Sequence, residues 1–344
     1  MWTLFMFRTL RFYLRCIKMA NCRSFSYFCF LVLLVYIFKG ADAVTQEMLD
    51  STFLRLNDTS QYIDENLTNS KNLLSQINDH RNITIYIHGY TESINSFSVK
   101  TIVDGKVIGV GSNIYFIFNN TYMTRGDHIV MAFDWSLIAK ESYLRVVESI
   151  EAVGRYLARA ISKMSCADHS ITRRIHIVAH SMGSHVAGAA GRIINPLLPR
   201  ITGLDPAGPL FNLLRNPLSS SDAEFVDIIH TDAGLYGKTL GSGHVDFWPN
   251  RGIRTQPGCP KSAAIYSEDD FCSHHRSWIF YAESLLSEKA FLAVRCSSNG
   301  KSSPTDLQII PMGYATPREA RGNYCLITSA QKPYGLQING AIEQ

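Results

Sequence analysis

The feature that most constrains the fold is a regular alternation of short apolar runs with helical segments. The runs are rich in β-branched residues, are typical of buried strands, and fall within residues 82–90, 128–136, 174–180, 200–208 and 225–232. Residues 143–164 carry apolar side chains at helical spacing, and a second helix of small residues is predicted to begin at Ser181. This alternation predicts an α/β fold whose mostly parallel sheet is covered by helices on both faces.

The pattern is less regular on either side of this region. Residues 44–80 are polar with weak periodicity, and beyond residue 232 we expect loops, a helix near 277–287 and a C-terminal stretch of undefined structure. No linker, internal repeat or low-complexity segment divides residues 44–344. We therefore expect one α/β domain over residues 44–344, long enough to bury a sizeable core.

The first 43 residues have the layout of a secretory signal peptide. Basic residues precede a twelve-residue apolar run, Tyr27–Phe38, and the short segment "ADA" at 41–43 follows it. Such a run is shorter than the roughly 20 residues that a membrane-spanning helix needs. We expect residues 1–43 to be removed and the chain to be secreted. A retained signal anchor is the alternative, and Met19 is an alternative start.

This leader also carries the positive charge of the chain. It holds six of the 33 basic residues and one of the 29 acidic residues, which leaves 27 basic and 28 acidic residues in 44–344. The remainder therefore has a formal charge of −1, and we expect no nucleic-acid partner.

Cysteines and sequons agree with secretion. Five cysteines follow residue 43, and in an oxidising compartment they should form disulfides, with one left unpaired or bridging molecules. Four N-x-S/T sequons predict a glycoprotein, at Asn57, Asn66, Asn82 and Asn119.

The segment "AHSMG" at 179–183 places Ser181 between small residues, after a predicted strand and before a predicted helix. A serine there lies on a sharp turn, and small neighbours let the strand and the helix approach closely. The turn presents the hydroxyl and directs the N–H of Met182 toward developing negative charge. We interpret Ser181 as a nucleophile, and the alternative is a serine that only caps a helix.

A nucleophilic serine needs a base and an acid that orients the base. Asp205 follows the next predicted strand, 24 residues after Ser181, which places it at the same edge of the sheet. Its alternative is a turn aspartate bonded to its own backbone. His274 and His275 follow in the chain order Ser, Asp, His, and chemistry alone does not choose between them.

The remaining groups near the predicted edge are a second oxyanion donor and further histidines. The N–H of Tyr90 is expected to be that donor, because Gly89 lets the backbone turn after a strand. Five other histidines are read as structural, and His180 is expected to point away from the nucleophile by strand alternation. These five are His88, His180, His185, His230 and His244.

These motifs resemble the pancreatic lipase family, in its secreted insect, phospholipase A1-like branch. The matching stretches span most of residues 44–344, and the most specific are "TGLDPAGP" at 202–209 and "CSHHRS" at 272–277. The resemblance implies an α/β-hydrolase in which Ser181 is the nucleophile, Asp205 the orienting acid and His274 the general base and acid. Ala179 stands where the family usually has the first glycine of the turn.

The resemblance also implies roles for backbone groups and cysteines. Tyr90 and Met182 would supply the oxyanion N–H groups, and a Cys259–Cys272 disulfide would close a lid loop. Cys296 is left to pair with Cys325 or Cys166.

The substrate expected from the resemblance depends on the lid. Twelve residues lie between Cys259 and Cys272, and the nearby segment 233–242 is also short. In this family short lids accompany phospholipase A1 activity, and long lids accompany triacylglycerol hydrolysis. We therefore expect a phospholipase A1 that acts on glycerophospholipids at a membrane or lipoprotein surface, with a triacylglycerol lipase as the alternative.

Neither metal nor cofactor is expected. The calcium loop of the family corresponds to residues 212–223, which keep one acid, Asp222. The chain ends where larger members begin a C-terminal β-sandwich, so we expect no such module and no obligate protein partner. Two rivals are a non-catalytic lipid-binding or yolk-type homologue, which the complete Ser, Asp, His set disfavours, and a secreted peptidase or thioesterase, which the lid-like loop disfavours.

Overall fold

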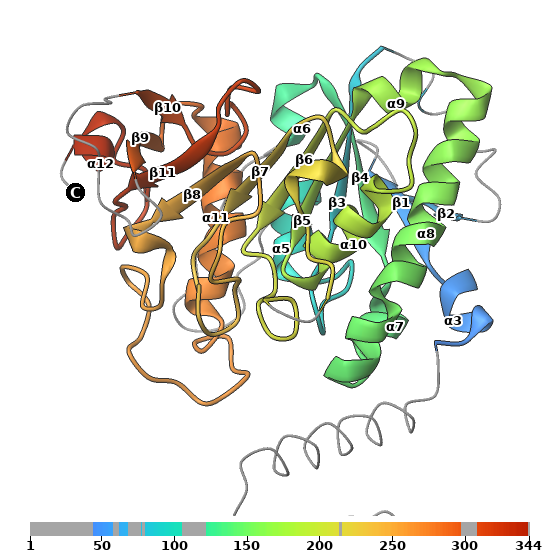
Figure 1. Ribbon diagram of the computed structural model, residues 1–344, viewed down its shortest axis with the longest axis horizontal. Helices are drawn as coiled ribbons and strands as arrows, with labels where there is room; N and C mark the ends of the chain where they lie inside the picture. The colour runs from blue at the N-terminus through green and yellow to red at the C-terminus, as the bar shows by residue number, and fades with distance from the viewer. Residues whose placement is uncertain are drawn as a thin grey trace, which may run out of the picture. The chain divides into compact units, whose positions relative to one another are not determined.

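A single sheet runs through the part of the chain that the computed structural model describes (Figure 1). The described residues are 44–57, 62–67, 77, 80–104, 122–212, 215–296 and 308–342. The expected signal segment 1–43 and the sequon at Asn119 lie outside them.

The described strands number eleven. They are β1 (Phe53–Asn57), β2 (Tyr62–Asn66), β3 (Asn82–Ile87), β4 (His128–Asp134), β5 (Ile175–His180), β6 (Arg200–Leu204), β7 (Val226–Ile229), β8 (Val245–Pro249), β9 (Leu292–Cys296), β10 (Ile309–Pro311) and β11 (Gly322–Leu326). Their order across the sheet is β10-β9-β11-β8-β7-β6-β5-β3-β4-β1-β2. In this order across the sheet, the adjacent strands from β11 through β8, β7, β6, β5 and β3 to β4 are parallel. The strands outside this block, β9 and β10 at one edge and β1 and β2 at the other, pair antiparallel. The prediction of a mostly parallel sheet is confirmed.

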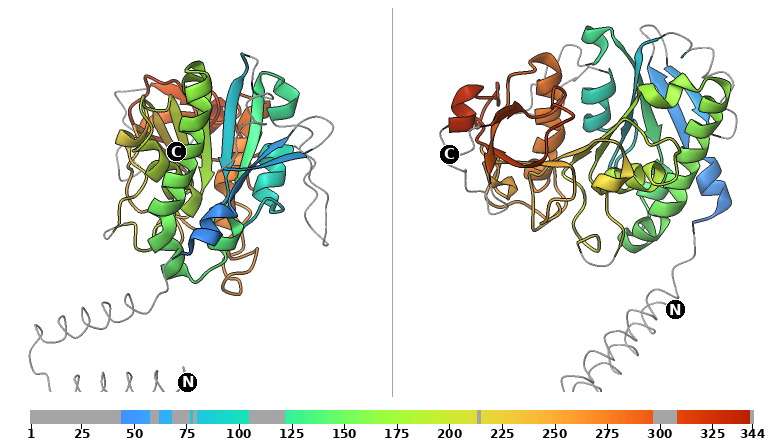
Figure 2. Two further views of the ribbon diagram at one scale, coloured as in Figure 1. Left: turned by 90° about the vertical axis from the view of Figure 1, so that its right-hand side faces the viewer. Right: turned by 45° about the horizontal axis from the view of Figure 1, so that its top comes forward.

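Helices cover both faces of this sheet (Figures 1 and 2). They are α3 (Gln46–Asp50), α5 (Phe97–Val99), the π-helix η1 (Lys100–Asp104), α6 (Tyr122–Arg125), α7 (Ser136–Ala139), α8 (Tyr143–Ala167), α9 (Ser170–Arg174), α10 (Met182–Gly191), α11 (Cys272–Leu286) and α12 (Ile338–Ile342). Two short 3₁₀ helices are η2 (Ser220–Asp222) and η3 (Asn250–Gly252). Helices α8 and α10 lie on one face, and α5, η1 and α11 lie on the other.

Strand alternation divides the core between the two faces. In β3, Ile83, Ile85 and Ile87 pack on the side of α8 and α10, whereas Tyr86 packs on the side of α11. Because successive side chains of a strand point to opposite faces, a strand buried on both sides is apolar throughout. This is why the central strands read as continuous apolar runs in the sequence.

The regions of weak periodicity contain the edges of the sheet. Residues 44–80 supply β1 and β2, and the C-terminal stretch supplies β9, β10 and β11. Helix α11 begins at Cys272, five residues before the predicted start near 277, so the two candidate histidines lie in its first turn. These strands are only three to five residues long, and so short a stretch gives a weak periodic signal.

Two disulfides join segments near the C-terminal edge. Cys296 pairs with Cys325 and links β9 to β11, and Cys259 pairs with Cys272 and encloses residues 260–271. Cys166 is exposed and unpaired. None of the described helices has the length and the apolar character needed to cross a bilayer.

Candidate active site

Ser181 lies on a strained turn between β5 and α10. Its backbone has φ 53° and ψ −123°, a conformation that costs a non-glycine residue on the order of 1–3 kcal/mol. Its N–H donates to the carbonyl of Leu204 on the neighbouring strand, at 3.0 Å. Gly183 is required because a Cβ there would lie 2.5 Å from the carbonyl oxygen of His88. The close approach of helix and strand therefore forces the serine into this turn.

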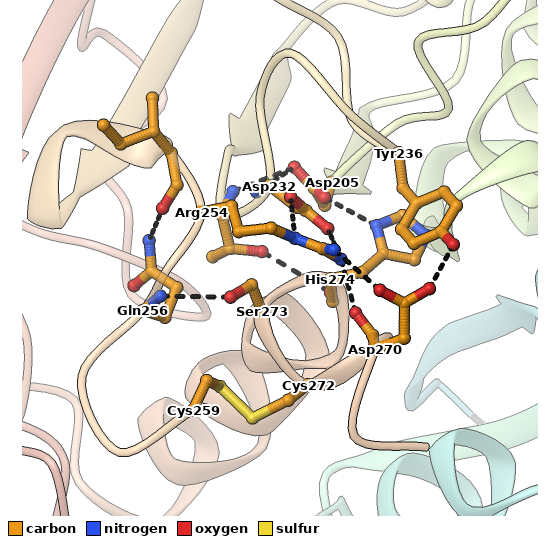
Figure 3. Close-up of polar contacts among 12 residues, drawn as sticks. Asp205, Asp232, Tyr236, Arg254, Gln256, Cys259, Asp270, Cys272, Ser273 and His274 are labelled. Carbon is orange, nitrogen blue, oxygen red and sulfur yellow. Dashed lines mark hydrogen bonds and ion pairs between the residues drawn. A yellow bond between two sulfur atoms is a disulfide. The ribbon is translucent and has the colours of Figure 1, made fainter. Parts of the chain in front are cut away.

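Asp205 follows β6, beside β5, and its carboxylate is held by three donors (Figure 3). Its Oδ2 lies 2.6 Å from Nδ1 of His274, and its Oδ1 accepts from the N–H groups of Thr231 at 2.8 Å and Asp232 at 3.2 Å. The side chain is fully buried. A buried carboxylate with three donors is fixed in orientation, and it can hold one tautomer of His274.

His274 is the member of the histidine pair that contacts Asp205. Burial lowers the pKa of His274, although the hydrogen bond that its Nδ1 donates to Asp205 works in the opposite direction. The imidazole is therefore neutral near pH 7, with its Nδ1 proton directed at Asp205. Its Nε2 then carries the lone pair that a general base needs.

Ser181 and His274 line one cavity of about 470 Å³. Among the described residues, no hydrogen bond joins the Ser181 hydroxyl to His274. Nucleophile–base contacts in resting active sites are commonly long and shorten when substrate binds. The structure thus joins His274 to Asp205 and places Ser181 on the same cavity.

Tyr90 and Met182, the residues expected to supply the oxyanion N–H groups, line the same cavity. In the described part of the chain, neither N–H donates to a protein acceptor. A Cβ on Gly89 would lie 3.0 Å from Cβ of Ser181, so the turn after β3 approaches the serine closely. Two free N–H groups beside a serine are suited to bind an oxyanion.

The structure corrects the interpretation of His180. Its ring lines the cavity, and its centroid lies 4.6 Å from that of His274. By strand alternation His180 shares the face of Val178, and this is the face that α11 covers, so its ring lies beside His274. Its Nδ1 contacts Glu92 Oε2 at 3.0 Å, and Glu92 also accepts the N–H of Gly89 at 2.5 Å.

Glu92 is a site residue that the sequence analysis missed. Despite burial, which acts in the opposite direction, His180 holds the pKa of Glu92 well below its usual range. The carboxylate joins the turn before Tyr90 to the residue before Ser181. The only indication of this role in the sequence is that an acidic residue lies two positions after the segment "HGY", which follows a strand.

The mouth of the cavity is aromatic and partly apolar. Tyr236 and Tyr266 line the cavity, with Phe271 between them in ring contact with both. Ile265 and Tyr266 in the lid loop are 79% and 68% exposed, and Leu240 in the neighbouring loop is 68% exposed. The loops that frame the cavity therefore present apolar side chains to the surroundings.

The loop that would correspond to a calcium site does not fit a cation. The carboxylate of Asp222 accepts from Arg192 at 3.0 Å and from the N–H of Ser219 at 2.8 Å. A guanidinium already neutralises this acid. No group of three or more His, Cys, Asp or Glu side chains is placed to bind a metal ion within the described ranges.

The parallel sheet and the turn at Ser181 define the class of protein as an α/β-hydrolase. Within that class the chain belongs to the pancreatic lipase family, because the family model named Lipase matches residues 38–334.

Relatives of known name agree with this assignment. Pancreatic lipase-related protein 2 of Cavia porcellus is 33% identical over 232 residues, which are 65% of this chain and 48% of that protein. Pancreatic triacylglycerol lipase of Myocastor coypus is 38% identical over 186 residues, and that of Homo sapiens 36%, each covering 48% of this chain. These alignments cover 40% and 39% of the two lipases. The chain therefore spans less than half the length of these curated relatives.

Proposed function

We propose that this chain hydrolyses lipid esters through a triad of Ser181, His274 and Asp205. The observation that carries the proposal is the buried His274–Asp205 hydrogen bond on the cavity that holds the strained serine. Membership of the pancreatic lipase family supports a carboxylic ester as the substrate.

The proposed reaction is acyl transfer in two halves. Nε2 of His274 takes the proton of Ser181 as Oγ forms a bond to the ester carbonyl carbon, and the N–H groups of Tyr90 and Met182 bind the resulting oxyanion. The C–O bond to the alcohol then breaks, and His274 returns the proton to that alcohol. Water attacks the acyl-serine by the same route and releases the fatty acid.

For the finer substrate class we propose phospholipase A1 activity. The lid loop is short, and three consecutive acids, Glu268–Asp270, lie at its end. A small, partly acidic lid leaves room for a charged head group, whereas a large apolar lid favours neutral lipid. Triacylglycerol hydrolysis is the second candidate, favoured by the names of the relatives.

We also propose that the chain is secreted and glycosylated, with residues 1–43 as signal peptide and residues 44–344 as one catalytic domain. The two disulfides support an oxidising compartment. Asn66 and Asn82 are exposed, as a glycan requires, and Asn57 ends β1. We propose no cofactor. The exposed apolar loops at the cavity mouth support a membrane or lipoprotein surface as the place of action.

Labelling with a serine-directed phosphonate tests the nucleophile. The purified protein should take up one phosphonate, and Ser181→Ala should take up none, because only an activated hydroxyl attacks phosphorus rapidly. Mass spectrometry of the intact protein reads the result. Label that persists in Ser181→Ala would remove this serine from the proposal.

A substrate panel decides between the two lipid classes. Wild type and Ser181→Ala are assayed side by side on phosphatidylcholine vesicles, a triacylglycerol emulsion and a peptide ester. We expect fatty-acid release chiefly from the vesicles, and none by the variant. Release chiefly from the emulsion would select the triacylglycerol lipase instead.

A further inference from the structure

Arg254 binds two carboxylates that belong to different parts of the candidate site (Figure 3). Its Nε and Nη2 contact Asp232 at 3.1 and 2.8 Å, and its Nη1 contacts Asp270 Oδ1 at 2.8 Å. Nη2 also donates to the backbone carbonyl of Asp270. We call Arg254, Asp232 and Asp270 the Arg254 clamp.

One arm of the Arg254 clamp reaches the acid of the proposed triad. Asp232 follows Thr231, and the N–H groups of both residues donate to Oδ1 of Asp205. The orientation of the Asp205 carboxylate therefore depends on where the backbone at 231–232 lies. The Asp232 side chain, fully buried, is tied by Arg254 through two hydrogen bonds.

The other arm reaches the segment that carries His274. Asp270 lies two residues before the first residue of α11 and four before His274. Its carboxylate also accepts from the hydroxyl of Tyr236 and from the N–H of Tyr266 at 3.0 Å. The last residues of the lid loop, which lead into α11, are thus held to the same guanidinium.

The electrostatics of the Arg254 clamp differ from those of a surface ion pair. Burial raises the pKa of Asp232 to about 7, while Arg254 acts to lower it. Hydrogen bonds from Tyr236 and Arg254 lower the pKa of Asp270 in spite of burial. A guanidinium is planar and offers several donors, so it can bridge two carboxylates in a way that an ammonium cannot.

We propose that Arg254 is a positioning residue, which sets the mutual orientation of Asp205 and His274 by binding Asp232 beside the acid and Asp270 beside the base. This inference rests on the proposed function. Arg254 does not adjoin the cavity, so its effect is on the geometry of the acid–base pair and not on contact with substrate.

The test compares Arg254→Ala, Arg254→Lys and a control, Arg145→Ala, which removes an arginine of α8 that forms an ion pair with Glu141. Turnover of a water-soluble short-chain p-nitrophenyl ester separates catalysis from adsorption to lipid. We expect kcat to fall by about tenfold or more in Arg254→Ala with KM within about twofold. Arg254→Lys should recover part of the loss, because an ammonium reaches one carboxylate at a time, and Arg145→Ala should match wild type.

A second readout needs no turnover. The proton between His274 Nδ1 and Asp205 should give a low-field ¹H NMR resonance that is assigned by its loss in Asp205→Asn. We expect it to shift or broaden in Arg254→Ala and to persist in Arg145→Ala. If Arg254→Ala does not fold, Arg254→Lys decides by the same two readouts.

The outcomes separate the two proposals. A folded Arg254 variant with wild-type kcat and an unchanged resonance would overturn the positioning role and leave the proposed function intact. A wild-type protein that neither hydrolyses the ester nor takes the phosphonate would overturn the proposed function. In that case an altered resonance in Arg254→Ala would still support the effect of the clamp on the His274–Asp205 pair.

Discussion

At the scale of single residues, the candidate site is built from buried polar groups that hold one another. Asp205 has three donors, and Glu92 joins Gly89 to His180 and also accepts from the hydroxyl of Ser98 at 2.7 Å. Such groups are costly to bury alone, and each contact therefore restricts the position of the next. The strain at Ser181 persists because the surrounding contacts leave no other conformation.

Glu92 offers a test at this scale. Glu92→Gln keeps the shape but removes the charge that accepts from Gly89, next to the proposed oxyanion donor Tyr90. Hydrogen bonds to charged groups contribute about 1.5–3 kcal/mol, so we expect kcat on a soluble ester to fall by roughly tenfold. The control is Glu288→Gln, an exposed acid paired with Arg125. Equal kcat in Glu92→Gln and wild type would show that the carboxylate does not support the site.

At the scale of elements, the site depends on how closely two helices approach. Helix α8 carries Gly154 at its point of contact with α10, and a Cβ there would lie 2.4 Å from Cβ of Ala189. Helix α10 in turn is buried throughout, and it begins at the residue after Ser181. The position of the serine is therefore coupled to small residues on α8.

Gly154→Ala tests this coupling because two effects oppose each other. Helix propensity favours alanine by about 1 kcal/mol, whereas overpacking costs typically about 1–3 kcal/mol. The contact is with Cβ and backbone atoms, which cannot swing aside, so we expect net destabilisation of about 1 kcal/mol or more in urea unfolding. Arg155→Ala, at an exposed position of the same helix, should change stability by less than about 0.5 kcal/mol. If Gly154→Ala were more stable than wild type, α8 and α10 would be able to move apart for the added methyl group without a loss of folding free energy.

At the scale of the whole molecule, several buried histidines are neutral in the fold. Burial lowers the pKa of His128 to about 4 and that of His185 to about 3, and it lowers the pKa of His176 well below its usual range. Both ring nitrogens of His185 are used, with Nδ1 accepting from Leu218 N–H and Nε2 donating to the carbonyl of Ala207. A proton on Nδ1 would break the first of these bonds.

These histidines predict that stability falls as the pH drops below about 6.5. Below that value the unfolded chain binds a proton at each histidine and the folded chain does not, so each costs about 1.4 kcal/mol per pH unit until its folded pKa is reached. The melting temperature should fall from pH 6.5 to 5, because these histidines outnumber Asp232, whose pKa of about 7 makes the opposite contribution. His185→Gln should reduce that slope, and His169→Gln, at an exposed position, should not. A melting temperature that does not change between pH 7.5 and 5 would contradict the neutral assignment.

The central architecture and the identities of the proposed catalytic groups follow from patterns that are local in the sequence. Strands that are buried on both faces are apolar throughout, and the close approach of strand and helix requires small residues around Ser181. Both features can therefore be recognised in short stretches of the sequence. The choice of His274 over His275 was carried by the family resemblance alone, since the two are neighbours of identical chemistry. In the structure only His274 contacts Asp205.

The contacts between groups that are distant in the sequence become visible only in the folded chain. Three residues of the site, Glu92, His180 and Arg254, lie in separate segments of the sequence. None of them belongs to a motif whose spacing predicts which residue it contacts. Their roles depend on contacts between residues up to 88 positions apart, which local patterns do not encode. The edge strands and the pairing of Cys296 with Cys325 were likewise decided by long-range packing. A periodic pattern in the sequence indicates which face of one helix or strand is buried. A site, in contrast, forms where several helices, strands and loops come together, and they come together only in the folded chain.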